Sequence, residues 1–111
     1  MSDNVSEIQA GDFETRVRAA SEPVVLDFFS TECPPCEALA PKFEAVAEQF
    51  KGKVRFYKIY RQGSRDLAAQ LSVSGSPTLL FFKGGKEFGA RMSGDIKRSE
   101  LKQAVEAMLA D

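Results

Sequence analysis

The stretch that decides the fold of this chain is Val24-Val25-Leu26-Asp27-Phe28-Phe29-Ser30-Thr31-Glu32-Cys33-Pro34-Pro35-Cys36. Its first half is an apolar run broken only by Asp27. Because this run is rich in β-branched and aromatic residues, it predicts a central strand, Val24 to Ser30, that is buried on both faces. The second half ends in the only two cysteines of the chain, and a helical pattern follows from Glu37 to Phe50. The sequence therefore predicts a C-x-x-C pair where a buried strand passes into a helix.

The two cysteines lie where thiol chemistry is favoured. Residues three apart on the first turn of a helix are close enough to form a disulfide. The N–H groups at a helix start lack partners and, together with the helix dipole, favour an anion, so we expect the Cys33 thiolate to be stabilised. Cys36 lies one turn further in and should be more shielded. Pro34 and Pro35 suit this turn, because proline has a near-helical φ and lacks an N–H that would be unpaired there. A reactive thiolate beside a shielded thiol is the arrangement that thiol–disulfide exchange requires.

The composition is that of an ordinary globular protein. The chain has 111 residues, of which 43% are hydrophobic and 28% charged, and this predicts one domain over residues 1–111 with a loose tail at 1–4. Fifteen basic and sixteen acidic residues give a net charge of −1, so nothing indicates binding to nucleic acid or to an anionic membrane. No apolar run approaches the ~20 residues of a membrane helix, and the N-terminus shows no signal peptide. We therefore expect a monomer in the cytoplasm, where two cysteines indicate catalysis rather than a structural disulfide.

The absence of histidine narrows the chemistry further. It excludes Cys–His nucleophilic catalysis and most histidine-based metal sites. Two thiols alone cannot close a tetrahedral zinc site unless a second chain supplies the other ligands. A soft metal such as Cu(I), which thiolates prefer, remains an alternative use of the pair, as does a partner-binding module with little turnover. On the main hypothesis no cofactor is needed beyond a redox-active disulfide between Cys33 and Cys36.

The spacing of apolar residues predicts an α/β protein. The early strands alternate with helices, which requires parallel pairing and right-handed crossovers, while the last two strands form a hairpin around Gly84-Gly85. Helices must then cover both faces of the sheet. Pro41 lies inside the first long helix and should kink it. The expected strands are 5–8, 24–30, 54–59, 78–83 and 86–92. The expected helices are 12–20, about 34 or 35 to 50, 64–71 and 97–109.

Four features of the sequence occur together in a known family. They are the run Val25 to Phe29 leading into the cysteines, Pro41 five residues after Cys36, the segment Gly75-Ser76-Pro77-Thr78-Leu79-Leu80-Phe81-Phe82-Lys83-Gly84-Gly85, and Gly94 ahead of the last helix. In these features the chain resembles the thioredoxins, from about residue 5 to residue 110. The resemblance implies the thioredoxin fold, with a central mixed five-stranded sheet and four helices on its two faces.

The resemblance also implies a function and its catalytic residues. The chain would be a thiol–disulfide oxidoreductase that reduces or exchanges protein disulfides, with Cys33 as the attacking thiolate and Cys36 as the resolving thiol. Asp27 matches the buried carboxylate that accepts the proton of the resolving cysteine, and Lys58 matches the lysine beside it. Elementary electrostatics agrees, because a carboxylate in an apolar strand should have a raised pKa that suits proton transfer near neutrality. The implied partners are disulfide-containing proteins and a thioredoxin reductase or a similar electron donor.

The substrate groove is implied in the same way. Pro77 matches a cis-proline packed against the cysteines, where it would leave a backbone edge at Ser76 open to an extended substrate peptide. The residues expected to contact substrate are Glu32, Pro34, Pro35, Gly75, Ser76, Pro77 and Gly94.

The sequence departs from the family at the rim of this groove. The family usually has Trp-Cys-Gly-Pro-Cys-Lys, whereas residues 32–37 read Glu-Cys-Pro-Pro-Cys-Glu, and the chain has no tryptophan. The acidic residues on either side of the cysteines should partly oppose thiolate formation. Ser76 replaces an apolar residue, and Tyr60-Arg61-Gln62 replaces an acidic strand end. We expect these changes to alter the choice of partners more than the chemistry, and we expect Arg61 and Arg65 to be surface charges.

Overall fold

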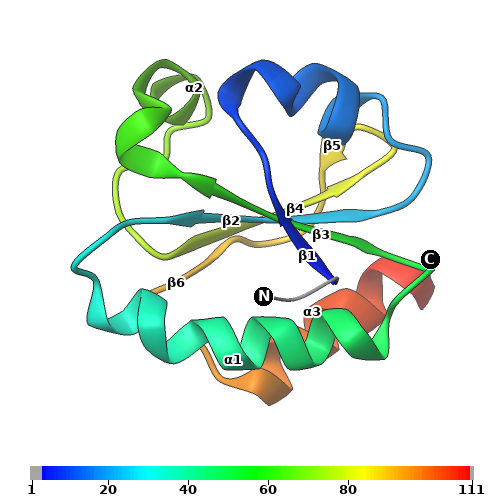
Figure 1. Cartoon of the computed structure of the whole chain (residues 1–111). Helices are drawn as coiled ribbons and strands as arrows, with labels where there is room; N and C mark the ends of the chain where they lie inside the picture. The colour runs from blue at the N-terminus through cyan, green and yellow to red at the C-terminus, as the bar shows by residue number, and fades with distance from the viewer. Residues whose placement is uncertain (1–3, 111) are drawn as a thin grey trace.

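The computed structural model describes residues 4–110, and a mixed β-sheet forms its centre (Figure 1). The strands follow the order β1-β3-β2-β4-β5, and β6 also pairs with β4. The first three strands in sequence are parallel, and β4 runs antiparallel to β2. The bounds are Val5–Glu7 for β1, Val24–Phe29 for β2, Arg55–Tyr60 for β3, Thr78–Lys83 for β4, Lys86–Glu87 for β5 and Met92–Ser93 for β6.

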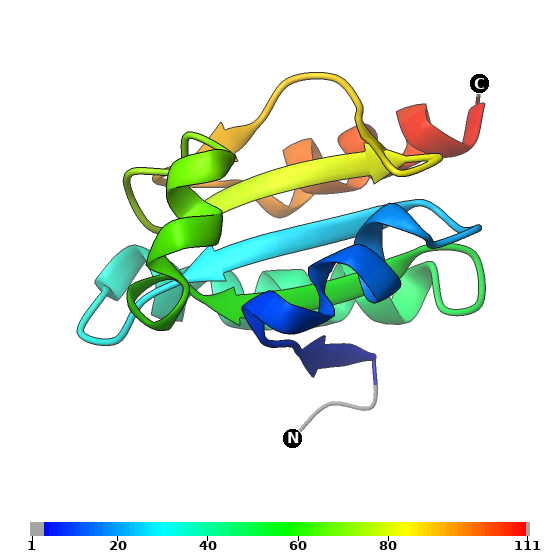
Figure 2. The same cartoon turned by 90° about the horizontal axis from the view of Figure 1, so that it is seen from above.

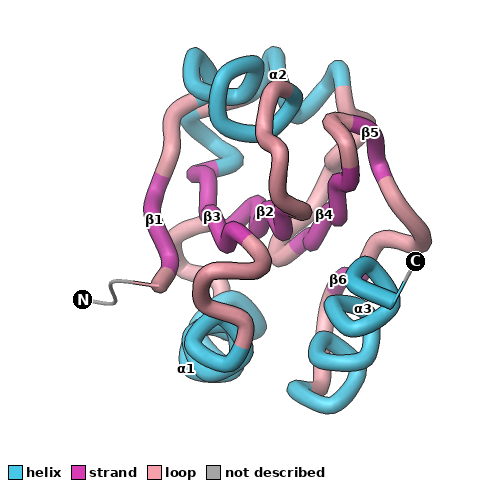
Figure 3. The backbone as a smooth tube through the Cα atoms, turned by 90° about the vertical axis from the view of Figure 1, so that its right-hand side faces the viewer, coloured by secondary structure: helices cyan, strands magenta, loops and turns pink. Residues whose placement is uncertain are grey.

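Helices cover both faces of this sheet. One face carries α1 (Pro34–Gln49) and α3 (Arg98–Ala110), and the other carries α2 (Arg65–Gln70) with two short helical segments, η1 and η2, that precede β2 (Figures 1 and 3). The α/β architecture predicted from the sequence is therefore confirmed. The segment 12–20, expected as one helix, consists of a 3-10 turn and a π-helical turn. Their bounds are Ala10–Asp12 for η1 and Glu14–Arg18 for η2.

Side-chain alternation along β2 separates two cores. Val25 packs with residues of α1 and α3, whereas Leu26 and Phe28 pack on the opposite face with residues such as Phe13. Successive side chains of a strand point to opposite faces, so Asp27, two residues after Val25, points to the face that α1 covers. Full burial of a large apolar side chain contributes roughly 1.5–3 kcal/mol, and both faces of β2 are filled in this way. The two cores thus hold Asp27 beneath α1.

Three loops meet at one end of the sheet. Because β2 and β3 are parallel, both end at the edge where the antiparallel strand β4 begins. The loop from β2 to α1, the 3-10 turn η3 (Arg61–Gly63) after β3, and the loop before β4 therefore lie together. Figure 2 shows these connections at the same end of the strands. This end holds both cysteines and Pro77.

The strand expected at 86–92 is divided in the structure. It forms β5 and β6, which pair with opposite ends of β4, so the sheet has six strands where five were expected. The backbone N–H of Phe88 still donates to the carbonyl of Phe81 at 2.7 Å. Gly89 then adopts a φ of +68°, which turns the chain out of the sheet until Met92.

Pro41 lies inside α1, which is continuous from Pro34 to Gln49. The kink expected at Pro41 stays a prediction, as does the single domain over residues 1–111. The expected loose tail lies outside the described residues except for Asn4. Among the helices of residues 4–110, none has the length and apolar character that crossing a membrane requires.

Candidate redox-active site

Both cysteines lie at the first turn of α1. Cys33 is the N-cap residue, and Pro34 and Pro35 occupy the next two positions, as the sequence predicted. A disulfide joins Cys33 to Cys36, with their Cα atoms 5.2 Å apart. The backbone N–H of Cys36 donates to the Cys33 Sγ at a distance of 3.3 Å. A helix N–H is therefore already directed at the sulfur that would carry negative charge after reduction.

The two cysteines are shielded to nearly the same extent. Their exposed fractions are 9% for Cys33 and 8% for Cys36. The greater shielding expected for Cys36 is thus not apparent in the disulfide form. Which sulfur attacks a substrate stays a prediction from the helix position and the family pattern.

The loop before β4 closes over the disulfide. The Ser76–Pro77 peptide bond is cis, as the resemblance implies. The carbonyl oxygen of Ser76 lies 3.6 Å from the Cys33 Sγ, and Pro77 is buried. The Thr78 hydroxyl donates to the Gly75 carbonyl at 2.8 Å, which ties the loop to the start of β4. This loop therefore brings a partly exposed backbone segment against the reactive sulfur.

Asp27 lies buried beneath α1 with an exposed fraction of 6%. Its Oδ1 atom makes no hydrogen bond to the part of the chain that the structure describes. Loss of hydration raises the pKa of Asp27 to about 7, and the positive charge of Lys58 acts in the opposite direction. A carboxyl group with such a pKa exchanges its proton near neutrality, which is the property expected of it from the sequence.

Lys58 lies beside Asp27 in the sheet. The two residues are register partners in the parallel pair of β2 and β3. The Nζ atom of Lys58 lies 5.4 Å from the centre of the Phe29 ring, a cation–π distance. Lys58 is half-buried. The structure thus places this lysine where it can bias the ionisation of Asp27.

The residues predicted to contact substrate fall into two groups. Gly75, Ser76, Pro77 and Gly94 line a hollow of about 340 Å³, and of these Ser76 also contacts the Cys33 Sγ. Three others, Glu32, Pro34 and Pro35, are exposed around the cysteines but do not line this hollow. Further lining comes from hydroxyl-bearing residues and an arginine that sequence reasoning did not single out: Ser72, Ser74, Thr78, Ser93 and Arg91.

Sequence reasoning also missed a polar cluster on the other side of Ser76. The Nε of Arg61 donates to the Ser76 hydroxyl at 2.7 Å, and this hydroxyl also forms a short hydrogen bond with the hydroxyl of Ser30. Arg61 is half-buried, so the expectation of a plain surface charge was wrong for it, whereas Arg65 is exposed as expected. The sequence contained a signal for this contact. Ser76 before Pro77 and Arg61 after the third strand both depart from the family pattern, and a hydroxyl and a guanidinium can form a hydrogen bond with each other.

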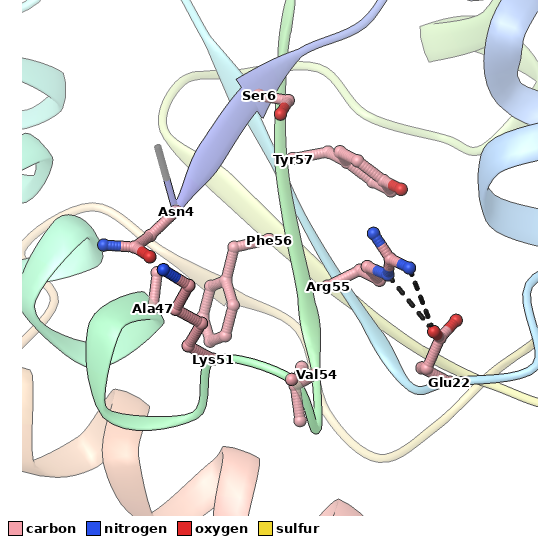
Figure 4. A pocket seen from close by; sticks show the side chains of 10 residues that line it. Asn4, Ser6, Glu22, Ala47, Lys51, Val54, Arg55, Phe56 and Tyr57 are labelled. Atoms are coloured by element: carbon pink, nitrogen blue, oxygen red, sulfur yellow. Dashed lines mark hydrogen bonds and ion pairs between the residues drawn. The ribbon is translucent and has the colours of Figure 1, made fainter. Parts of the chain in front are cut away.

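A second hollow lies at the far end of α1. Figure 4 shows this hollow of about 300 Å³, where Arg55 binds the carboxylate of Glu22 through its Nε at 3.3 Å and its Nη2 at 3.1 Å. Ala47 lines this hollow and lies eleven positions after Cys36 on α1, which corresponds to roughly 17 Å of helix at 1.5 Å per residue. Neither cysteine lines this hollow, and we assign it no role in the redox chemistry.

In residues 4–110 no three side chains of the metal-ligating types Cys, Asp, Glu and His are grouped so as to hold a metal ion. No residue of the site is therefore assigned as a metal ligand.

Comparison with known proteins establishes the family. The model of the thioredoxin family matches residues 4–107. Thioredoxin-2 of Saccharomyces cerevisiae is 38% identical over 96 residues, which cover 86% of this chain and 89% of the yeast protein. A thioredoxin of Peptoclostridium acidaminophilum is 34% identical over 110 residues, with 99% and 96% covered. The chloroplastic thioredoxin X of Arabidopsis thaliana is 32% identical over 106 residues, which cover 95% of this chain but only 58% of that longer protein.

The chain therefore belongs to the thioredoxin family. Its mixed sheet, with helices on both faces and cysteines at the start of α1, is the thioredoxin fold expected from the sequence. The predicted enzyme class is confirmed as well, and the chain is a disulfide oxidoreductase of the thioredoxin type.

Proposed function

We propose that this protein reduces or exchanges disulfides of other proteins, with Cys33 as nucleophile and Cys36 as resolving thiol. The observation that carries the proposal is the disulfide at the N-terminus of α1, with the Ser76 carbonyl 3.6 Å from the Cys33 Sγ. A reactive sulfur, a helix N–H directed at it and an accessible backbone edge are thereby combined in one place.

The reaction transfers two electrons from the dithiol to the substrate. In the reduced protein the Cys33 thiolate attacks one sulfur of the substrate disulfide, and the other substrate sulfur leaves as a thiolate that takes up a proton. The Cys36 thiol then loses its proton and attacks the Cys33 Sγ. This step releases the second substrate thiolate and forms the Cys33–Cys36 disulfide. An external dithiol or a reductase must return the two electrons.

Asp27 would accept the proton that Cys36 loses. Its carboxyl group faces the side of the sheet that α1 covers, and its pKa of about 7 leaves it partly ionised at neutral pH. Lys58 supports this role, because its positive charge favours the ionised carboxylate. Asp27 and Lys58 would therefore serve the proton transfer, while Cys33 and Cys36 would carry the two electrons.

The substrate would bind as an extended chain beside Ser76. Pairing of backbone groups at an exposed edge gives affinity without demanding a particular sequence, which suits an enzyme with several protein substrates. Glu32, Pro34, Pro35, Gly75, Pro77 and Gly94 would form the rest of the contact surface. A thioredoxin reductase or a similar donor would recycle the protein, and a monomer in a reducing compartment such as the cytoplasm stays a prediction.

Substitution of each cysteine tests the proposal. With insulin as the substrate and dithiothreitol as the donor, Cys33→Ser should abolish the catalysed reduction. Cys36→Ser should instead accumulate a mixed disulfide between Cys33 and insulin, which mass spectrometry detects. Sustained turnover by the Cys33→Ser protein would reject the assignment of the nucleophile. Stoichiometric Cu(I) binding without insulin reduction would favour the metal-binding alternative.

A further inference from the structure

Arg61 and the Cys33 sulfur both contact the same residue, Ser76. Arg61 opens η3, directly after β3, and reaches across the end of β2 to the loop before β4. Its Nε donates to the Ser76 hydroxyl at 2.7 Å, while the carbonyl of the same Ser76 lies 3.6 Å from the Cys33 Sγ. Because Ser76 contacts both the Arg61 guanidinium and the Cys33 Sγ, the distance between these two groups is no longer than about three residues of an extended substrate chain, at ~3.4 Å per residue.

The surrounding hydrogen bonds hold this guanidinium in place. The Ser76 hydroxyl that Arg61 binds is also bonded to the hydroxyl of Ser30. The next residue of η3, Gln62, accepts a hydrogen bond from the backbone N–H of Thr31 at 3.4 Å. The turn is thus attached to both loops beside the disulfide. A half-buried arginine held in this way has less side-chain entropy to lose when it binds a ligand.

Most of the hydrogen-bonding capacity of Arg61 is unused. A guanidinium has five N–H donors, and the bond to Ser76 uses one of them. Within residues 4–110 no acidic side chain forms an ion pair with Arg61, in contrast to Arg55, which binds Glu22, and Arg91, which binds Glu87. Its two Nη groups are therefore available to a carboxylate from outside, in the forked geometry that arginine offers.

The general electrostatics of the site does not favour acidic partners. The chain has a net charge of −1, and Glu32 and Glu37 flank the cysteines. Preference for an acidic substrate would therefore have to come from a specific contact. Arg61 provides such a contact on the side of Ser76, where the backbone of an extended substrate would run.

We propose that Arg61 is a specificity-determining residue that selects disulfides with an aspartate or glutamate next to the attacked cysteine. The substrate carboxylate binds the free edge of the guanidinium while the Cys33 thiolate attacks the neighbouring sulfur. This inference rests on the proposed disulfide reduction, and it assigns to that reaction a class of substrate.

Two matched peptides and two matched variants test the inference. The substrates are disulfide-linked homodimers of one short peptide, with either glutamate or glutamine on both sides of its single cysteine. The kcat/KM for each is measured with the wild-type protein, Arg61→Gln and Arg65→Gln. Arg65 is exposed on α2, and within residues 4–110 only Arg61 of the two arginines binds the Ser76 hydroxyl, so Arg65→Gln makes the same change of charge without removing that contact. The ratio of the two kcat/KM values cancels any general loss of activity that a shifted Ser76 loop causes.

We expect Arg61→Gln to lower the glutamate-to-glutamine ratio about two- to fivefold at low ionic strength, the range for one partly exposed charged contact. Arg65→Gln should leave the ratio unchanged, and added salt should reduce the wild-type ratio. A ratio that Arg61→Gln does not change, or that both variants lower equally, overturns the inference while the disulfide reduction stands. If the wild-type protein reduces neither peptide, the proposed function fails and the inference fails with it.

Discussion

Asp27 and Lys58 are neighbours across β2 and β3, yet no ion pair joins their side chains within residues 4–110. The Lys58 Nζ lies over the ring of Phe29 instead, and the Asp27 Oδ1 has no hydrogen-bond partner in the same part of the chain. The charge of the lysine therefore lowers the pKa of the carboxyl group without cancelling the effect of burial, and the pKa stays at about 7. This relationship leads to three predictions about the carboxyl group.

The first concerns the pH dependence of catalysis. In the wild-type protein the rate of the resolving step should rise with pH through about 7, as Asp27 becomes able to accept a proton. Asp27→Asn should remove this inflection and slow the step at pH 8 by about tenfold or more, since general bases commonly contribute at least that much. Stopped-flow measurement of mixed-disulfide decay against pH provides the test. An identical pH profile for the two proteins would remove Asp27 from the mechanism.

The second concerns stability. Because the folded-state pKa of Asp27 is raised from 3.8 to about 7, the folded protein binds this proton more tightly than the unfolded chain does. The free energy of unfolding should therefore fall as pH rises from 4 to 7, by roughly 3–4 kcal/mol from this group alone. Asp27→Asn should lose that part of the pH dependence and be more stable than the wild type at pH 8. Urea unfolding of the oxidised proteins at pH 5 and pH 8 measures the effect.

Asp66→Asn serves as the control for this experiment, because Asp66 is exposed on α2. Its unfolding free energy should follow the wild-type dependence on pH. If Asp27→Asn also follows the wild-type curve, the carboxyl group does not titrate in the manner described.

The third prediction concerns Lys58. Its positive charge lowers the pKa of Asp27, so Lys58→Met should move the inflection of the resolving step to higher pH. At neutral pH the variant should be slower, because less of the carboxyl group is ionised. Lys53→Met, in the exposed turn before β3, removes the same charge elsewhere and should leave the inflection in place. A lack of any shift in Lys58→Met would mean that the lysine plays no part in the proton transfer.

The elements around the cysteines could be predicted because their patterns are local and strong. An apolar run broken only by Asp27 predicts β2, and the cysteines with two prolines predict a start of α1 at about Pro34 or Pro35, close to the observed start at Pro34. The divided strand at 86–92 could not be predicted in the same way. Its first part, β5, consists of only two charged residues, Lys86 and Glu87. The break after it depends on the positive φ of Gly89 and on the hydrogen bond between Phe88 and Phe81.

The candidate site was predictable only in part, for a related reason. Asp27 and the cysteines belong to one continuous stretch, so their placement on β2 and at the start of α1 follows from the sequence of that stretch. The contact between Arg61 and Ser76 joins residues fifteen positions apart, and it exists because the sheet brings the end of β3 near the start of β4. Neither the local periodicity of the sequence nor its composition predicts that the end of β3 lies near the start of β4.

The last prediction concerns the turn between β4 and β5. Gly84 and Gly85 both have positive φ, at +61° and +79°, so an alanine at either position is disfavoured by the backbone, by about 1 kcal/mol. The surroundings of the two differ. A Cβ at Gly84 would meet nothing within 4 Å, whereas a Cβ at Gly85 would overlap the carbonyl oxygen of Arg18 at the end of η2.

Gly85→Ala should therefore cost more stability than Gly84→Ala, by about 2 kcal/mol, because the backbone of η2 would have to move away from the turn. Urea unfolding should show a lower midpoint for Gly85→Ala, with an unchanged slope, and a smaller shift for Gly84→Ala. Since the turn lies at the opposite end of β4 from Ser76, the rate of disulfide reduction by the folded Gly85→Ala protein should be preserved. Equal losses of stability in the two variants would contradict the close packing of η2 against this turn.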